Sequence, residues 1–276
     1  MPEACARPSS SRSSSRAPKV LPRPRKRFGQ HFLTDRHYLA RIVEAIGPRP
    51  GDRMVEIGPG TGLLTDELVR RVDHLDVVEI DRDLARALRE RYEAARVTVH
   101  EADALEFDFT ALPGPLRVAG NLPYNVSTPI LFRIAEITDH LSDGVFMLQK
   151  EVVERMVAEP ASPEYGRLSV MLQYRFAMAI ALRVPPGAFT PPPKVDSAVV
   201  RMKPLGSGHL QARDPSRFAA IVAAAFSQRR KTLRNALRAQ ADDGTFARAG
   251  IDPQRRGETL SVAEFVRLAD AVSSAG

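Results

Sequence analysis

Between residues 54 and 148, short apolar runs alternate with stretches whose apolar positions recur at helical spacing. Short apolar runs are typical of buried strands, and a spacing of three to four residues is typical of amphipathic helices. We expect strands at residues 54–57, 75–80, 97–99, 116–119 and 144–148, with helices at 63–72, 83–95 and 128–137. This alternation predicts an α/β fold, with a parallel sheet covered by helices on both faces and right-handed crossovers.

The flanking regions show other patterns. Thr34 has the character of an N-cap for a helix with apolar residues at positions 38, 39, 42, 43 and 46. After residue 160 we expect a helix at 168–176, a proline-rich loop at 185–193, and strands at 179–184 and 195–202. Gly206, Ser207 and Gly208 mark a linker. The C-terminal region then predicts a small all-helical second domain, with helices at 218–226, 232–239, 245–249 and 262–272.

Three parts follow from these patterns: a disordered basic arm at residues 1–24, an α/β domain at 25–204 and a helical domain at 205–276. The arm is rich in Ser, Arg and Pro and holds too few apolar residues to fold alone. It lacks the apolar core of a secretory signal. Its composition overlaps with that of organelle transit peptides, which stays open as a minor alternative.

The net charge of +7 favours a polyanionic partner. Nucleic acid is favoured over membrane, because no apolar run approaches the length of a spanning helix. The single Cys5 excludes an intramolecular disulfide and fits a reducing compartment, so we expect a cytoplasmic protein. No Cys and His cluster has metal-ligand spacing, so we expect no metal. Nothing in the sequence requires more than a monomer.

The stretch from Gly120 to Asn125 follows a predicted strand, at the edge where open α/β sheets bind ligands. Asn121 offers a side-chain carbonyl, and Pro123 biases Leu122 toward an extended conformation that presents its backbone carbonyl. Tyr124 adds a flat ring. Two acceptors beside an aromatic face suit the exocyclic amine of adenine. The alternative is an ordinary Asn-Pro turn with a packing Tyr.

Three further strand ends carry candidate ligand groups. The turn from Glu56 to Gly62 has the spacing G-x-G-x-G, which lets backbone approach a ligand or simply turn from strand to helix. Glu79 ends the second strand, where an acid can accept ribose hydroxyls. Asp103 follows the third strand and could accept an adenine amino group. Each acid alone could be a cap or a surface charge, but together they predict a pocket for an adenosine-bearing ligand.

Two basic segments are candidates for RNA contact. Cations and aromatics are interleaved from Arg25, Lys26 and Arg27 to Phe32. The second segment is expected to lie along one helix that begins near Gln228, with cations at Arg229, Arg230, Lys231, Arg234 and Arg238. In both cases the alternative is a solvated basic surface.

These segments resemble the small-subunit rRNA adenine N6,N6-dimethyltransferases, a family of Rossmann-like S-adenosylmethionine-dependent methyltransferases. The resemblance runs from about residue 25 to the C-terminus. Its six motifs, in order, lie at residues 25–33, at the Gly58 turn, and at 121–128, 165–169, 189–197 and 226–235. The one departure is His31, where Asn is common in the family.

The resemblance implies roles for individual residues. Asn121, Leu122 and Tyr124 would be catalytic, with Asn121 facing both the cofactor and the target amine. Tyr124 would stack on one face of the target base, and Phe189 is our candidate for the other face unless it anchors its loop in the core. Glu79 would hold the cofactor's ribose and Asp103 its adenine. The full cofactor site would comprise Gln30, His31, Leu33, Gly58, Gly60, Glu79, Asp103 and Asn121.

The resemblance also implies an activity. The enzyme would use S-adenosylmethionine to dimethylate the N6 amino groups of two adjacent adenosines in the loop of the 3'-terminal helix of 16S rRNA, in an immature 30S particle. The helical domain would bind RNA. The alternative is a non-catalytic ribosome-assembly or organellar transcription factor derived from this fold. A nicotinamide oxidoreductase is disfavoured by Leu63, because the dinucleotide fingerprint needs Gly or Ala there.

Overall fold

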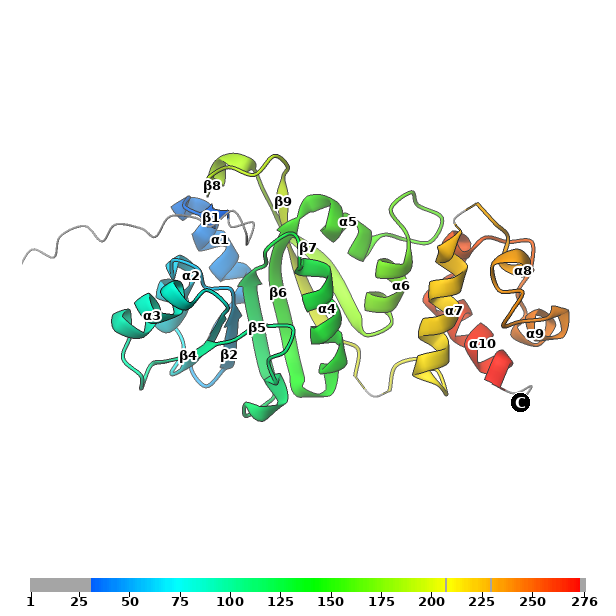
Figure 1. The fold of residues 1–276 in the computed structure, drawn as a ribbon, viewed down its shortest axis with the longest axis horizontal. Coiled ribbons are helices and arrows are strands. Elements are labelled where there is room, and N and C mark those ends of the chain that lie inside the picture. Colours follow the sequence, from blue (N-terminus) through cyan, green and yellow to red (C-terminus); the bar gives the residue numbers. More distant parts are fainter. Residues whose placement is uncertain (1–30, 207, 229, 274–276) are drawn as a thin grey trace, which may run out of the picture.

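The computed structural model describes residues 31–206, 208–228 and 230–273. Its centre is a seven-stranded sheet in the order β4-β3-β2-β5-β6-β9-β7 (Figure 1). The first five strands in this order are parallel, and β9 runs antiparallel to both of its neighbours. The strands are β2 Arg53–Ile57, β3 Leu75–Glu79, β4 Val97–Glu101, β5 Leu116–Asn121, β6 Leu141–Gln149, β7 Phe176–Val184 and β9 Ser197–Pro204.

The order of these strands reverses between β2 and β5. From β2 the chain moves outward through β3 to β4, and then returns to the other side of β2 as β5. In open α/β sheets the crevice at such a switch point, outside the carboxyl ends of the strands, is where ligands bind. The topology therefore places the ends of β2 and β5 at the centre of the candidate site.

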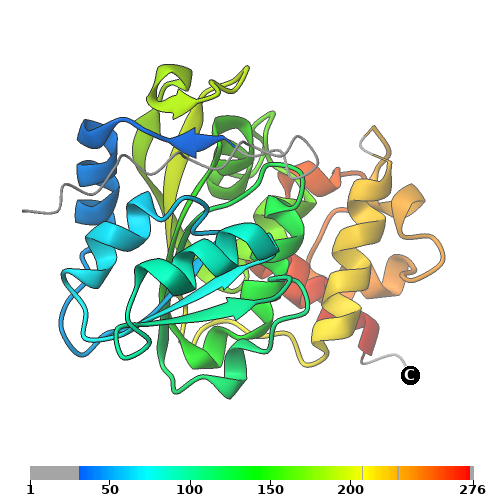
Figure 2. The same cartoon turned by 60° about the vertical axis from the view of Figure 1, so that its left-hand side comes forward.

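Helices cover both faces of the sheet (Figures 1 and 2). Side chains alternate along β6: Val145 and Met147 join a cluster with α1 and α2, whereas Phe146 and Leu148 join a cluster with α4, α5 and α6. This two-sided burial explains why the strand reads as a continuous apolar run. The helices that cover the two faces are α1 Arg36–Ile46, α2 Leu63–Val69, α3 Arg82–Arg91, α4 Ser127–Glu136, α5 Lys150–Val157 and α6 Arg167–Gln173.

The C-terminal helices gather at one end of the molecule (Figure 1). They are α7 Pro215–Ser227, α8 Leu233–Ala236, α9 Asp243–Ala249 and α10 Val262–Ser273. Their core also includes Tyr165, Val170 and Tyr174, from the end of the α/β region. The Tyr174 ring stacks on Phe218 at 4.2 Å between ring centroids, and the Tyr165 hydroxyl donates to the Leu260 carbonyl at 2.8 Å. The core of the helical part therefore extends back across the expected boundary at residue 205.

Short elements complete the chain. β1 Phe32–Leu33 pairs antiparallel with β8 Phe189–Thr190 and brings the start of the described chain beside the proline-rich loop. The 3-10 helices are η2 Phe109–Ala111, η3 Thr138–His140, η4 Pro186–Ala188 and η5 Gly257–Thr259. Every helix in the described ranges is too short or too polar to cross a membrane.

The expected α/β fold is confirmed, and several local expectations are wrong. The N-cap of α1 is Asp35, not Thr34, because the Asp35 carboxylate accepts from the amides of His37 and Tyr38. The expected helix at 168–176 stops at Gln173, and Phe176 already begins β7. Helix α5 was not expected at all. The expected helix at 232–239 shortens to the four residues of α8.

Candidate functional site

A cleft opens at the carboxyl edge of the sheet, at the switch point between β2 and β5. The space between its walls, with the open solvent at its mouth included, is about 910 Å³. Four neighbouring strand ends each contribute one expected residue to its wall: Gly58 after β2, Glu79 at the end of β3, Asp103 after β4 and Asn121 at the end of β5. The structure therefore brings these four expected residues together around one cleft.

Glu79 is a buried carboxylate held by two backbone donors. Its Oε2 accepts from the Gly60 amide at 3.1 Å, and its Oε1 accepts from the Asp81 amide at 2.9 Å. Burial raises the pKa of Glu79, and these amide donors oppose that rise. The carboxylate is therefore fixed in one orientation at the wall of the cleft.

The glycine turn is required for the local fold and also lies at the cleft. Gly58, Gly60 and Gly62 all adopt positive φ, at 68°, 56° and 81°, so the turn needs glycine for its shape alone. It also packs closely: a Cβ on Gly60 would lie 3.0 Å from the Phe32 ring. Gly58 lines the cleft, whereas Gly60 contributes through its amide to Glu79.

Asp103 both lines the cleft and caps the turn after β4. Its Oδ1 accepts from the Leu105 amide at 2.9 Å, and its carbonyl accepts from the amides of Glu106 and Phe107. The capping role weighed as the alternative is therefore present, and it holds the carboxyl group at the cleft wall.

Asn121 is oriented by a hydrogen bond to the start of the described chain. Its Nδ2 donates to the His31 carbonyl at 3.1 Å, and this bond assigns the flip of the amide. The Oδ1 of Asn121 is thereby left to act as an acceptor. Leu122 has a buried side chain, and its amide donates to the Met147 carbonyl at 3.1 Å, so only its carbonyl can serve a ligand.

Tyr124 lies half-buried in the cleft wall and not in the hydrophobic interior. Its hydroxyl is 2.7 Å from the Ser197 Oγ, and its ring stacks with His31 at 5.6 Å between centroids and 28° between planes. Burial raises the pKa of Tyr124, so the phenol keeps its proton and cannot act as a base near neutral pH.

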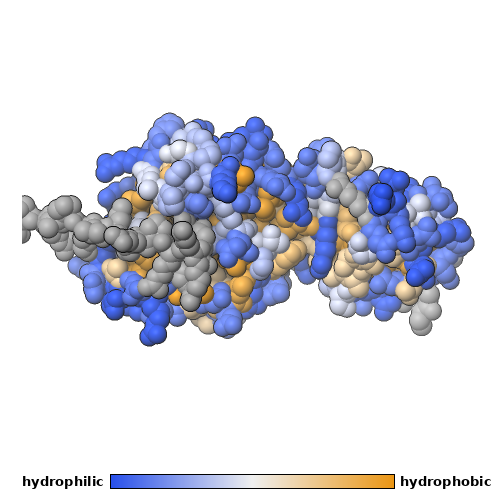
Figure 3. All heavy atoms as spheres, turned by 45° about the horizontal axis from the view of Figure 1, so that its top comes forward, coloured by the Kyte–Doolittle hydropathy of each residue, from blue (hydrophilic) through white to orange (hydrophobic). Residues whose placement is uncertain are grey.

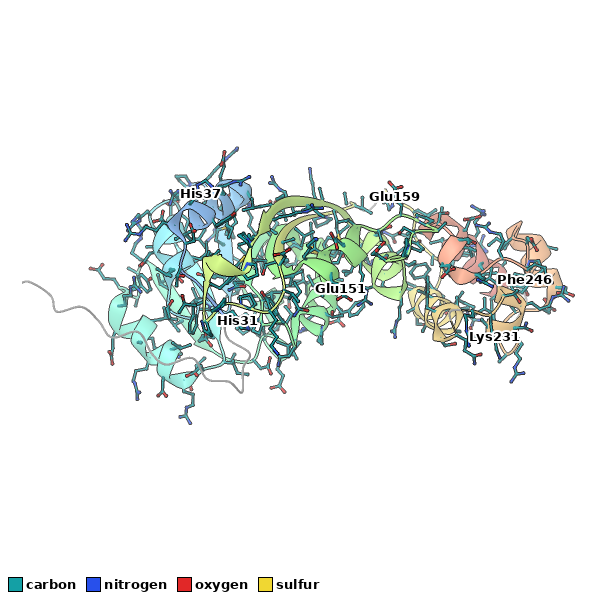
Figure 4. The ribbon with its side chains drawn as sticks, turned by 90° about the horizontal axis from the view of Figure 1, so that it is seen from above. His31, His37, Glu151, Glu159, Lys231 and Phe246 are labelled. Atoms are coloured by element: carbon teal, nitrogen blue, oxygen red, sulfur yellow. The ribbon has the colours of Figure 1, made fainter. Side chains whose placement is uncertain are left out.

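The segment that begins at His31 connects the cleft to the proline-rich loop. The His31 Nδ1 lies 2.8 Å from the Pro191 carbonyl, so the ring donates from this nitrogen. Figure 4 places His31 beside the ribbon of that loop. Leu33, expected at the cofactor, is instead buried and lines a neighbouring cavity beneath the glycine turn.

Phe189 requires a correction. It is 3% exposed and packs with Leu33 and Val199 in the core beneath the α1 layer. The structure therefore does not place Phe189 in the lining of the cleft, where the sequence predicts it to cover the target base. The alternative, a core anchor for the proline-rich loop, accounts for its burial.

The expected basic helix also requires a correction. Helix α7 ends at Ser227, and Gln228 already has a non-helical backbone, with φ −137° and ψ 84°. These cations are all exposed, but not on one continuous helix: Arg230 and Lys231 lie on the turn after α7, Arg234 on α8, and Arg238 on the turn after α8. Arg234 forms an ion pair with Asp243 at 2.8 Å. Four other expected RNA-contact residues and one expected cofactor residue lie outside the described chain: Arg25, Lys26, Arg27, Arg229 and Gln30.

Two residues in and beside the cleft are not predicted from the sequence. Ile80 lines the cleft next to Glu79 and is 46% exposed, which is unusual for a large aliphatic side chain and fits an apolar cover for a ligand. Its position directly after the strand-ending acid could have signalled it. Ser197 lies 73 residues from Tyr124 along the chain, so no local pattern could reveal their contact.

Glu56 is a second buried acid, below the glycine turn. Its Oε2 accepts from the Thr65 hydroxyl at 2.7 Å. Burial raises the pKa of Glu56 from 4.5 to about 8, the Thr65 hydrogen bond opposes this, and repulsion from Glu79 adds to it. The folded protein therefore holds a proton here that the unfolded chain releases near pH 4.5.

This linkage predicts how stability varies with pH. Because the folded state binds the extra proton between about pH 4.5 and 8, stability is greatest below this window and falls as pH rises through it. The loss should amount to roughly 2–5 kcal/mol at one pKa unit per 1.36 kcal/mol. Glu56→Gln should match the wild type in melting temperature at pH 5 and exceed it at pH 8.5. If the melting temperatures of the two proteins changed with pH in the same way across this range, Glu56 would not be a buried neutral carboxyl.

Apolar and hydrophilic residues are separated on one face of the molecule. In Figure 3, apolar residues gather along the middle of the face, between hydrophilic surfaces on either side. Within the described ranges, no group of three or more metal-ligating side chains converges.

Comparison with known proteins places the chain in a family. The family model for ribosomal RNA adenine dimethylase matches residues 22–274. The chain is 57% identical over 252 residues to the ribosomal RNA small subunit methyltransferase A of Aromatoleum aromaticum, covering 91% of this chain and 95% of the relative. A protein of the same name from Laribacter hongkongensis is 57% identical over 249 residues, covering 90% and 95%.

Solved structures show the same likeness. A dimethyladenosine transferase from Plasmodium falciparum superposes with a TM-score of 0.73 at 25% identity, covering 86% of this chain and 96% of the other. The 23S rRNA methyltransferase ErmE gives a TM-score of 0.68 at 27% identity, covering 88% and 99%. Together with the family model and the relatives, these matches show that this chain belongs to the ribosomal RNA adenine dimethylase family.

Proposed function

We propose that this chain uses S-adenosylmethionine to dimethylate the N6 amino groups of two adjacent adenosines in the loop of the 3'-terminal helix of 16S rRNA. Membership of the family and the high identity to small-subunit methyltransferases support the reaction class and the substrate. The single observation that carries the proposal is the orientation of Asn121. Its amide nitrogen is engaged by the His31 carbonyl, so an oxygen acceptor remains beside the Tyr124 ring.

The cleft fits the proposed cofactor. Carboxylates on two strand ends, Glu79 and Asp103, can accept from ribose hydroxyls and from an adenine amine, and Ile80 supplies an apolar cover. When bound, S-adenosylmethionine supplies a methyl group already activated by its sulfonium. These residues are therefore needed to bind and orient, not to create an electrophile.

The residues of the turn after β5 would prepare the target amine. The lone pair of adenine N6 is delocalised into the ring, so the amine is a poor nucleophile while it stays planar. Acceptors at the Asn121 Oδ1 and the Leu122 carbonyl would draw its N–H groups toward pyramidal geometry and aim the lone pair. Positioning of this kind can lower a barrier by several kcal/mol, up to roughly 7–11 kcal/mol in favourable cases.

No protein base is required in this mechanism. After transfer, the methylated ammonium is acidic enough to release its proton to water. The raised pKa of Tyr124 is consistent with this, because the nearest phenol remains a neutral stacking surface.

The target base must leave its stack to reach the cleft. Stacking on Tyr124 would offset part of that cost, at about 1–3 kcal/mol per base. The His31 ring already covers one face of Tyr124, so the base would use the other face or displace His31.

We further propose an immature 30S particle as the substrate, a monomeric enzyme and a cytoplasmic location. Figure 4 shows Lys231 near the end of the molecule remote from His31. A substrate that contacts both must be large, which supports a ribosomal particle over a short oligonucleotide. The direct test is methyl incorporation into undermethylated small subunits, with mass mapping of the modified adenosines. Incorporation at other positions, or none at all, would contradict the proposal.

Phosphate contacts by exposed cations predict strong salt dependence. We expect the affinity for small-subunit rRNA to fall by about a hundredfold or more between 50 and 200 mM salt, since four or more phosphate contacts each release counterions. Arg230→Ala combined with Lys231→Ala should reduce the slope of affinity against salt in a filter-binding assay. Arg86→Ala, which removes an exposed arginine paired with Asp83 on α3, serves as the matched control. If the affinity for rRNA did not change with salt, these cations would not be the residues that contact the RNA phosphates.

A further inference from the structure

Ser197 occupies an unusual place in the sheet. β9 runs antiparallel to β6, so the first residue of β9 lies at the same edge as the carboxyl end of β6. Ser197 is aligned there with Gln149, the last residue of β6, and with Val184, the last residue of β7. It is 0% exposed and does not line the cleft. A buried hydroxyl at the ligand edge needs a partner, because leaving it unpaired is costly.

That partner is Tyr124. The two hydroxyl oxygens lie 2.7 Å apart, a normal distance for a strong O–H···O hydrogen bond. The bond joins the turn after β5 to the start of β9 and satisfies two partly dehydrated hydroxyls at once. The same β9 end is fixed from the other side, because the Lys150 amide donates to the Asp196 carbonyl at 2.9 Å.

The Tyr124 side chain is thereby held at both ends. At the backbone end, the Ser127 hydroxyl donates to the Tyr124 carbonyl at 3.2 Å. At the far end, Ser197 holds the phenol oxygen, and the His31 ring lies against one face. Restraint at both ends sets the plane of the ring. A planar stacking surface positions a base only if its own plane is fixed.

The geometry points to Ser197 as a positioning residue for Tyr124, one that matters more for the second methyl transfer than for the first. This inference rests on the proposed function. An unmodified N6 has two N–H groups for the acceptors at Asn121 and Leu122, and a monomethylated N6 has only one. With one hydrogen bond fewer, the monomethylated base depends more on stacking for its orientation.

The test compares Ser197→Ala with the wild type in single-turnover reactions on undermethylated small subunits. Mass spectrometry of the digested rRNA gives N6-methyladenosine and N6,N6-dimethyladenosine separately. We expect the rate constant of the second transfer to fall about tenfold, as for the loss of one buried hydrogen bond, and that of the first to fall less. Monomethylated product should therefore accumulate. Ser197→Thr, which keeps the hydroxyl, should restore the wild-type ratio.

Two further variants separate positioning from folding. Tyr124→Phe removes the same hydrogen bond from the other side, so Ser197→Ala combined with Tyr124→Phe should be no worse than the more damaging single change. Ser169→Ala removes an equally buried hydroxyl on α6, outside the cleft lining, and should leave the product ratio unchanged.

An unchanged product ratio in Ser197→Ala, or additive effects in the double variant, would overturn the inference while leaving the proposed function intact. A wild-type enzyme that transfers no methyl group would instead overturn the proposed function itself, and the inference with it.

Discussion

Replacement of Asn121 by Ala should reduce methyl transfer by about 100- to 1000-fold, the range seen when one preorganised polar group at a reacting centre is removed. The amide nitrogen of Asn121 is held by the His31 carbonyl at 3.1 Å, so the variant loses an oxygen acceptor whose orientation is already set. Binding of rRNA should stay within about twofold, because most of that affinity comes from phosphate contacts. Single-turnover rates and filter binding measure the two quantities separately.

The control for Asn121→Ala is Gln211→Ala, which removes a side-chain amide from an exposed position between β9 and α7. The melting temperature of each variant shows whether the loss of the His31 contact has loosened the fold. If rRNA binding and turnover fall by the same factor, Asn121 is a structural residue and the account of the target amine fails.

Glu79→Gln should weaken the binding of S-adenosylmethionine by about 10- to 100-fold, as expected for losing hydrogen bonds to a charged acceptor. A second effect adds to this. Both oxygens of Glu79 accept from backbone amides, at Gly60 and Asp81, and a glutamine must turn its NH₂ group toward one of those donors. Isothermal titration with the cofactor measures the change without need of RNA.

Glu101 provides the matched control for Glu79, because the two residues are aligned in register on β3 and β4. The Glu101 carboxylate forms ion pairs with Arg82 and Arg89 and does not line the cleft. Glu101→Gln should therefore leave cofactor affinity unchanged. If both variants lost the same cofactor affinity, the cause would be a general change in the sheet. That result would contradict the assignment of Glu79 to the ribose.

The sequence predicts well those features that depend on local patterns. The strands of the sheet were predicted because doubly buried strands form continuous apolar runs, as in β6. The positions of Gly58, Glu79, Asp103 and Asn121 around one cleft followed from the rule that parallel strands end at the same edge. Each of these expectations needed only the type of residue and its place relative to a strand.

Features that depend on contacts between distant segments could not be predicted. The burial of Phe189 results from the pairing of β8 with β1, which lie more than 150 residues apart. The contact between Ser197 and Tyr124 depends on β9 entering the sheet in the antiparallel direction. The break after Ser227 is not signalled by proline or glycine, so the cations that follow α7 read as a continuing helix.

The most direct test of the proposed activity is the product that the purified chain forms on undermethylated 30S subunits with S-adenosylmethionine. We expect two methyl groups on each of two adjacent adenosines in the loop of the 3'-terminal helix, formed at least about 100-fold more slowly by Asn121→Ala. Methylation of another base, or full activity in the Asn121→Ala variant, would contradict it.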